Sequence, residues 1–243
     1  MLDGAPVVPV VFSPSDLSGL LLWLEGDGGT FQDSAGTIAA AAAGDVVGLW
    51  TDRSGNVSNA VQATTAQKPV LEAGPSSGTF GIRFDGGQGM ATGITAAIGD
   101  FTAFVCFRDR NGPASFERLI DKNYASGFWV GRSATGSDLM GGGIRQTSSP
   151  FGLFVAASDS SRHVIMHRRG GTTQTVRADA DAASLQTCSG LATDSTTPLQ
   201  IGVDSAGAGR LGGTIYAVLL YNRSLTDTDA AKVESYLATK WGV

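Results

Sequence analysis

One segment of the sequence carries side chains that could hold a metal ion. Within residues 50–56, Asp52 and Asn56 offer a carboxylate and an amide oxygen. Calcium accepts roughly six to eight oxygen ligands in flexible geometry, so these residues, with Asp85 further along the chain, form a candidate calcium site. Asp and Asn in a Ser-Gly turn also bond their own backbone and hold the loop in shape, and we favour that structural interpretation. Calcium is therefore an optional ligand, and we expect no required cofactor.

A second segment carries side chains of the kind that bind sugars. Asn123, Tyr124 and Trp129 lie close together in the sequence. An aromatic ring offers a flat apolar face, and an amide both donates and accepts hydrogen bonds. These three residues are a candidate glycan-binding patch.

No catalytic arrangement of carboxylates is recognisable. A retaining glycosidase holds two carboxyl groups about 5–5.5 Å apart, which a strand would present at alternate positions. Glu72, Glu117 and Glu234 each stand alone among carboxylates, and Glu25 is followed only by Asp27 and two glycines. We therefore expect that the protein is not an enzyme.

Two further patterns have simple structural interpretations. His163 and His167 have the spacing of a metal pair on a helix, but the apolar residues between them favour a strand, on which the two rings would lie about 13 Å apart. The run Gly141-Gly142-Gly143 lacks the lysine and the spacing of a phosphate-binding loop. We interpret it as a bulge or a loop.

The secondary-structure pattern is that of an all-β protein. Short apolar or alternating segments recur along the chain, such as residues 20–24, 81–84, 101–107, 128–131 and 163–167, and turn residues separate them. The alanine tract at 39–43 is bracketed by glycines too closely for a stable helix, so we expect a loop there.

The C-terminus is the one segment with helical periodicity. Thr226 stands three residues before Asp229, as in a helix start, and Ala230, Val233, Leu237 and Trp241 follow at helical spacing. This predicts a single amphipathic helix from about residue 227 to 240.

Charge and composition exclude several partners. The formal net charge of the 243 residues is −5, and Arg168 and Arg169 are the longest basic run, so nucleic acid is not an expected partner. No apolar run approaches the length of a membrane span, and the first residues do not resemble a secretory signal. Cys106 and Cys188 are too few for a disulfide framework.

The first thirteen residues form a separate, extended arm in this interpretation, and residues 14–243 form one domain. Prolines at 6, 9 and 14 favour extended backbone. The arm carries apolar side chains that would form an exposed patch in water. These side chains are Val7, Val8, Val10, Val11 and Phe12. Either they cover an edge of the domain's own sheet or, as we favour, they bind a partner.

Several motifs resemble the laminin-G-like, concanavalin-A-like jelly-roll domains of phage virion proteins and bacterial surface proteins. The resemblance covers most of the chain, and its motifs follow in the same order as in the family. It rests most clearly on the run Gly-Asp-Val-Val-Gly-Leu-Trp-Thr-Asp-Arg-Ser-Gly-Asn at residues 44–56. The other matching segments are residues 14–24, 68–71, 82–86, 213–216 and 236–242. It implies a two-sheet antiparallel β-sandwich, or jelly roll, with one C-terminal helix. The sequence departs from the family at residues 87–89, where an acidic pair is usual.

Members of this family bind glycans, calcium or proteins, or only assemble, so the fold leaves the function open. Our first hypothesis is a phage virion structural or accessory protein, such as a decoration, tail or fibre component, made in the host cytoplasm and bound to other virion proteins or to itself. The alternative is a carbohydrate-binding, lectin-like module of a bacterial surface or secreted protein, with a cell-surface glycan as its partner.

Overall fold

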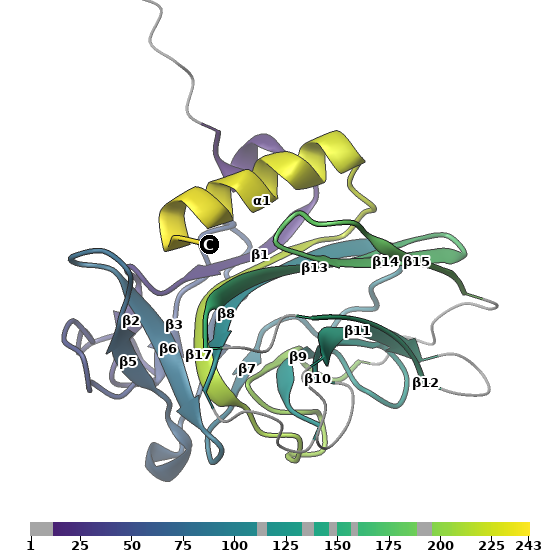
Figure 1. The fold of residues 1–243 in the computed structure, drawn as a ribbon. Helices are drawn as coiled ribbons and strands as arrows, with labels where there is room; N and C mark the ends of the chain where they lie inside the picture. Colours follow the sequence, from purple (N-terminus) through teal and green to yellow (C-terminus); the bar gives the residue numbers. More distant parts are fainter. Residues whose placement is uncertain (1–11, 111–115, 133–138, 146–149, 157–159, 189–195) are drawn as a thin grey trace, which may run out of the picture.

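The computed structural model describes residues 12–110, 116–132, 139–145, 150–156, 160–188 and 196–243. Its strands form two antiparallel sheets that face each other (Figure 1). Sheet A contains β1 (Leu20–Glu25), β5 (Val70–Ala73), β6 (Phe80–Asp85), β8 (Phe101–Asp109), β13 (Arg162–Gly170), β14 (Thr173–Ala178), β15 (Ser184–Thr187) and β17 (Gly212–Tyr221). Sheet B contains β2 (Thr30–Phe31), β3 (Leu49–Trp50), β4 (Ala60–Val61), β7 (Met90–Thr92), β9 (Arg118–Asp121), β10 (Phe128–Arg132), β11 (Leu139–Arg145), β12 (Pro150–Ala156) and β16 (Gln200–Ile201).

The described helices are few. Two short 3-10 turns, η1 (Pro14–Asp16) and η2 (Thr65–Gln67), accompany the α-helix α1 (Asp227–Trp241). The predicted two-sheet antiparallel β-sandwich with a C-terminal helix is therefore confirmed. The alanine tract at 39–43 lies in a loop, as expected.

Strand β8 is buried on both faces and separates two hydrophobic cores. Phe101, Val105 and Phe107 point into the core between the sheets, whereas Phe104 and Cys106 point into a second core beneath α1. Because side chains alternate along a strand, a continuous apolar run is needed to fill both cores. The segment 101–107 supplies that run.

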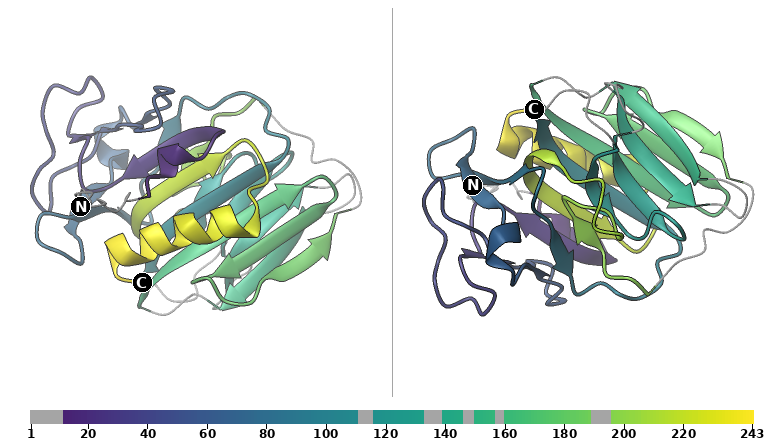
Figure 2. Two further views of the ribbon diagram at one scale, coloured as in Figure 1. Left: turned by 90° about the horizontal axis from the view of Figure 1, so that it is seen from above. Right: turned by 90° about the horizontal axis from the view of Figure 1, so that it is seen from below.

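Helix α1 covers the outer face of sheet A, beside β1 (Figure 2). Its side chains Ala230, Val233, Leu237 and Trp241 are buried in the second core, as the sequence predicts. The side chain of Thr226 accepts a hydrogen bond from the N–H of Asp229 and caps the helix start. The molecule thus has three layers: α1, sheet A and sheet B.

A buried ion network joins the two sheets. Arg132 at the end of β10 in sheet B donates to Asp109 at the end of β8 in sheet A, and its Nε donates to Glu117 at 3.0 Å. Glu117 in turn accepts the N–H of Gly212, the first residue of β17, at 2.9 Å. The three charged side chains are almost fully buried, so they must satisfy one another.

The glycine run that we interpreted as a bulge or a loop lies inside strand β11, so that prediction is wrong. A side chain at Gly142 would meet the ring of His167, and one at Gly143 would meet the ring of Trp129, at 2.3 Å and 2.4 Å from the added carbon. The glycines are needed for close packing of rings against the sheet. His163 and His167 lie on strand β13, as predicted.

Two other features of the described part of the chain bear on the expected partners. No helix there is long and apolar enough to cross a membrane. Cys106 and Cys188 are both free and buried.

We predict that Arg132→Leu lowers the free energy of unfolding by about 3–5 kcal/mol, because removing one member of a buried ion pair leaves the other charges uncompensated. Arg83→Leu is the matched control, since Arg83 pairs with Asp85 at the surface and such pairs contribute about 1 kcal/mol or less. Urea unfolding of the two variants measures the difference, and equal losses would contradict the role given to the network.

Candidate functional site

The strand register places one row of side chains on the outer face of sheet B. Trp129 of β10 lies opposite Asp121 of β9, Asp121 opposite Gln200 of β16, Gln200 opposite Ala91 of β7, and Ala91 opposite Val61 of β4. Residues directly opposite in neighbouring strands share a face. The adjacent row points the other way, into the core between the sheets, and contains Val130, Ile120, Ile201 and Met90.

A groove of about 420 Å³ crosses β4, β7 and β16 on this outer face. Its floor includes Val61 and Ala91. Polar side chains surround this floor, and among them are Gln62, Gln67, Gln200, Asp204 and Arg210. The groove therefore combines amides, one carboxylate and one guanidinium around a small apolar floor.

Hydrogen bonds hold the polar side chains of the groove in place. The guanidinium of Arg210 donates to the carbonyl of Gly87 at 2.8 Å, and the amide of Gln200 donates to the carbonyl of Pro198 at 3.2 Å. The Asp204 carboxylate accepts two N–H groups of its own loop, at 2.9 Å and 2.7 Å. The groove is thus organised before any ligand enters, which lowers the entropy cost of binding.

A cluster of aromatic rings around Arg118 lies on β9, β10 and their connections. The Arg118 guanidinium carbon is 4.3 Å from the ring centre of Trp129, 5.2 Å from that of Tyr124 and 6.0 Å from that of Phe116. Phe116 and Tyr124 are 48% and 36% exposed, whereas Trp129 is 4% exposed. Trp129 therefore lies beneath Arg118, and the rings that a ligand could meet are those of Phe116 and Tyr124.

Arg118 connects the buried ion network to this cluster. Its Nη1 donates to the carbonyls of Glu117 and Arg132, at 3.2 Å and 3.0 Å. Both residues are members of the network that joins the sheets. The network thereby fixes the guanidinium on which the rings pack.

The turn between β9 and β10 places Tyr124 at the surface. Asn123 has a positive φ of 76°, a conformation that Asn tolerates better than most residues. The Asp121 carboxylate accepts the N–H groups of Asn123 and Tyr124, at 2.7 Å and 3.0 Å. A side chain at Gly127 would lie 2.0 Å from the Lys122 carbonyl, so glycine closes the turn.

Burial shifts the pKa values of Asp121 and Arg118 in this cluster. It raises the pKa of Asp121 to about 6, although Arg118 and the two N–H groups favour the ionised form. Burial also lowers the pKa of Arg118, and the nearby carboxylates of Asp121 and Asp204 offset part of this decrease. Asp204 lines the groove and acts on Arg118, so the groove and the cluster are electrostatically connected.

The three residues that the sequence suggested for glycan binding come together on this hairpin. The rings of Tyr124 and Trp129 are 6.3 Å apart, and the side-chain amide of Asn123 donates to Thr197 Oγ1 at 3.2 Å. The sequence analysis did not identify Arg118, Gln200, Asp204 or Arg210. The alternation of polar Gln200 with apolar Leu199 and Ile201 was a signal for one of them.

Of the proposed calcium ligands, Asp52 and Asn56 lie in one turn, where both bond to the Ser54 hydroxyl, and Asp85 lies apart from them. Asp52 follows β3 in the turn, and its carboxylate accepts the N–H groups of Trp23, Ser54 and Ser58 at 2.9 Å each. The Asn56 amide donates to the carbonyl of Leu20 at 2.8 Å, and Asp85 ends β6 in an ion pair with Arg83. No group of three or more His, Cys, Asp or Glu side chains that could hold a metal occurs among the described residues.

Of the five arm residues that we expected to bind a partner, only Phe12 is among the described residues. Its ring contacts Tyr236 of α1 edge-on, with the centroids 6.3 Å apart. Val7, Val8, Val10 and Val11 lie outside the described residues.

Comparison with known proteins finds relatives by structure alone. No protein-family model and no curated protein matches the sequence. Among solved structures, the binding domain of Paraclostridial Mosquitocidal Protein 1 matches with a TM-score of 0.63 and 12% identity over 92% of this chain and 53% of that chain.

Two further structures share the fold. One is of botulinum neurotoxin type C, whose cell entry depends on interaction with two ganglioside molecules, with a TM-score of 0.62 and 10% identity over 92% of this chain and 52% of that one. The other is an arabinofuranosidase complexed with arabinofuranosyl-α-1,2-xylobiose, with a TM-score of 0.59 and 15% identity over 81% of this chain and 51% of that one. The chain therefore spans about half the length of these proteins and shares their fold.

We predict a pH-dependent effect of Asp121→Asn. Because the pKa of Asp121 rises from 3.8 to about 6 on folding, its contribution to stability is complete below pH 3.8 and is lost as the pH rises through 6. The unfolding free energy of the variant, relative to the natural protein, should therefore rise by up to about 3 kcal/mol between pH 3.5 and 7.5.

Asp45→Asn is the control with the opposite sign. Hydrogen bonds from the N–H groups of Ala41 and Ala42 lower the pKa of Asp45, so its contribution is present above pH 3.8 and is lost as the pH falls. Chemical unfolding at several pH values measures how the unfolding free energy of each variant, relative to the natural protein, depends on pH. For Asp121→Asn, a relative unfolding free energy that is constant or falls as the pH rises would contradict the burial argument.

Proposed function

We propose that this chain is a carbohydrate-binding, lectin-like module that binds a glycan on the outer face of sheet B without hydrolysing it. The observation that carries the proposal is the groove of about 420 Å³ with amide, carboxylate and guanidinium side chains, whose Asp204 acts on the same Arg118 that contacts the exposed rings of Tyr124 and Phe116. A glycan on a cell surface is the proposed partner, which places the module where it can reach the outside of a cell.

The chemistry of the groove suits sugar hydroxyl groups. Each hydroxyl both donates and accepts a hydrogen bond, and the planar side-chain amide of Gln200 can do both. Tyr124 and Phe116 offer apolar ring faces for the C–H surface of a sugar ring. Binding sites for small ligands commonly combine such apolar surfaces with a few fixed polar groups.

The charges near the groove favour a neutral sugar. The basic side chains Arg118 and Arg210 and the acidic side chains Asp121 and Asp204 are equal in number. Such a balanced set gives little net attraction for an anionic or a cationic ligand. We therefore propose neutral oligosaccharides as the first ligands to test.

The structural neighbours support a search among glycans. The arabinofuranosidase structure contains an oligosaccharide, and the botulinum neurotoxin type C work describes an interaction with gangliosides. The identities are too low for residues to be carried over, and fold alone does not determine function. The neighbours favour the lectin-like alternative over our first hypothesis of a virion structural protein.

Binding without catalysis is part of the proposal. Asp109 and Glu117 approach each other, but both bind the same Arg132 guanidinium and are almost fully buried. A catalytic pair needs one carboxyl group that releases a proton to the substrate and access to the sugar ring. The observed pair is suited to joining the sheets.

We predict that Tyr124→Ala and Gln200→Ala each weaken glycan binding roughly tenfold, which corresponds to about 1.4 kcal/mol. The first variant removes an exposed ring, and the second removes an amide from the groove. A glycan array identifies the ligand, and titration calorimetry then measures the dissociation constants of the variants.

Leu185→Ala and Gln186→Ala on β15 of sheet A are the matched controls, since they change similar side chains away from the groove. They should bind as the natural protein does. If no neutral or charged glycan binds, or if the controls lose as much affinity as the groove variants, the proposed function is wrong.

A further inference from the structure

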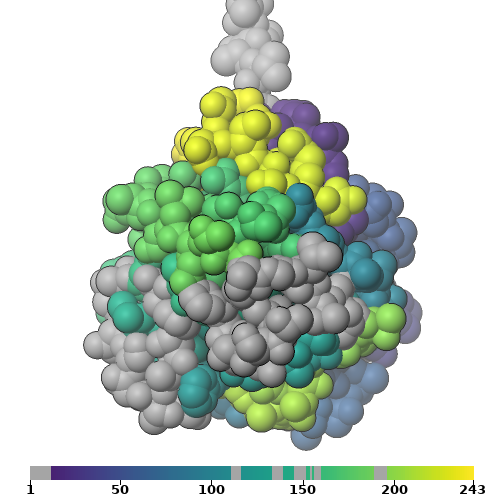
Figure 3. Space-filling view, turned by 90° about the vertical axis from the view of Figure 1, so that its right-hand side faces the viewer, coloured from purple at the N-terminus to yellow at the C-terminus, as the bar shows by residue number. Residues whose placement is uncertain are grey.

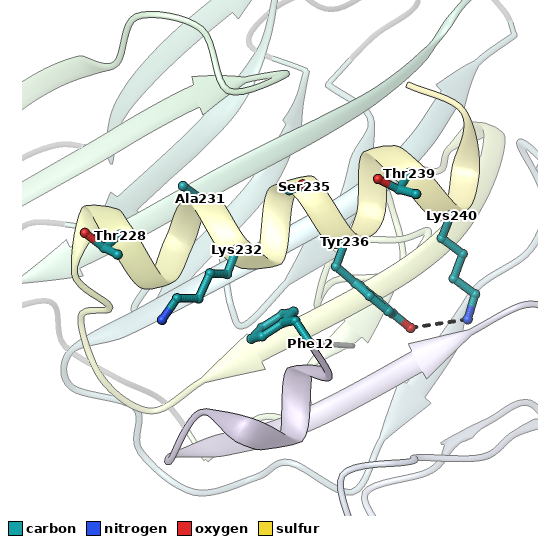
Figure 4. Close-up of a pocket in the computed structure, with 8 residues that line it drawn as sticks. All are labelled: Phe12, Thr228, Ala231, Lys232, Ser235, Tyr236, Thr239 and Lys240. Carbon is teal, nitrogen blue, oxygen red and sulfur yellow. Dashed lines mark hydrogen bonds between the residues drawn. The ribbon is translucent and has the colours of Figure 1, made fainter. Parts of the chain in front are cut away.

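A second groove lies along the outer surface of α1, on the opposite side of the molecule from sheet B. It has a volume of about 660 Å³ and is lined by Phe12 and by helix residues that include Ala231, Ser235 and Tyr236 (Figure 4). In the space-filling view, α1 (yellow) and the purple residues beside it lie together at one end of the described part of the molecule (Figure 3). This groove is distinct from the proposed glycan site.

Short side chains line the solvent side of the helix. Thr228, Ala231, Ser235 and Thr239 are exposed and follow one another at intervals of three or four residues, which places them on one face. A surface helix usually presents longer charged residues on its outer face. Lys232 is the long charged side chain among the exposed helix residues that line the groove, and the row of short side chains beside it allows another segment of chain to approach the helix closely.

The other wall of the groove is held rigidly. The Tyr236 hydroxyl donates to the buried Glu25 carboxylate at 2.8 Å, and Lys240 Nζ donates to the same carboxylate at 2.7 Å. The Tyr236 ring also contacts Trp23 and Phe12 edge-on, with centroid distances of 6.4 Å and 6.3 Å. The groove is therefore formed before a ligand binds, and Phe12 already occupies part of it.

We infer that residues 7–11 of the same chain bind in this groove, in an extended conformation along α1. These residues continue directly from Phe12 and read Val-Val-Pro-Val-Val, so they supply the apolar surface that a mainly apolar groove requires. Phe12 lines the groove and directly follows this segment, so the site and its proposed occupant are neighbours in the sequence.

The dimensions agree. Phe12 contacts Tyr236, and the helix rises about 14 Å over the nine steps from Tyr236 back to its first residue, Asp227, at 1.5 Å per residue. Five extended residues span about 16 Å at 3.3 Å per residue. Pro9 restrains both its own backbone and that of Val8 to extended conformations, so the segment loses less entropy when it binds.

Covalent linkage decides between the chain's own arm and the arm of a second copy. A short linker gives the chain's own arm an effective concentration in the millimolar range. At micromolar protein concentrations, an arm of a second copy with equal affinity is outcompeted by roughly a thousandfold. The arm therefore binds within one molecule and covers α1.

The test uses a variant that lacks residues 2–11 and a labelled peptide of residues 2–11. Both described hydrophobic cores lie within residues 12–243, so the deletion removes none of their members. The peptide should bind the shortened protein at least about tenfold more tightly than the full chain, because the full chain's own arm competes. In the full chain, the double substitution Val8→Asp and Val10→Asp should open the groove to the peptide in the same way.

Ala231→Arg in the shortened protein should block the peptide, whereas Ala43→Arg, at an exposed loop position, should not. Peptide binding that is absent, or equal in the full and shortened chains, would overturn the inference. A full chain that is dimeric in light scattering and becomes monomeric on deletion would show instead that the arm binds a second copy. None of these outcomes depends on glycan binding.

Discussion

The structure depends on the buried interaction of Arg132 with Asp109 and Glu117. The three charges are almost fully buried between the two sheets, so each must find its partner within the protein. The geometry fixes the ends of β8 and β10 against each other, and the Glu117 carboxylate adds the first residue of β17. Directional hydrogen bonds to a guanidinium add an orientation-specific link between the sheets to that of the close-packed apolar core.

The same interaction organises the outer face of sheet B. The backbone carbonyls of Glu117 and Arg132 hold the Arg118 guanidinium, and Trp129, Tyr124 and Phe116 pack around it. This arrangement leaves the rings of Tyr124 and Phe116 exposed. The polar side chains of the groove on the same face are already hydrogen-bonded within the protein. A preorganised surface of this kind is suited to binding a ligand with many hydroxyl groups, and its rigidity limits the entropy lost on binding.

The all-β class and the C-terminal helix were predictable from local apolar runs and one helical repeat, whereas the two-sheet arrangement was implied by the family resemblance. Residues 101–107 and 226–241 illustrate these local patterns. The groove was not predictable, since Gln200, Asp204 and Arg210 meet strands β4 and β7 only through the sheet register, which no local pattern specifies. The glycine run at 141–143 was misinterpreted because its purpose, room for the rings of Trp129 and His167, depends on residues distant in the sequence.

Mapping a bound oligosaccharide by nuclear magnetic resonance tests the central claim most directly, because it locates the ligand without any substitution. The amide signals of isotope-labelled protein would be followed during titration with a neutral oligosaccharide. Our account predicts that the largest shifts occur at the outer face of sheet B, around Tyr124, Gln200 and residues 204–210. Shifts concentrated on α1 or on sheet A, with the groove signals unchanged, would contradict it.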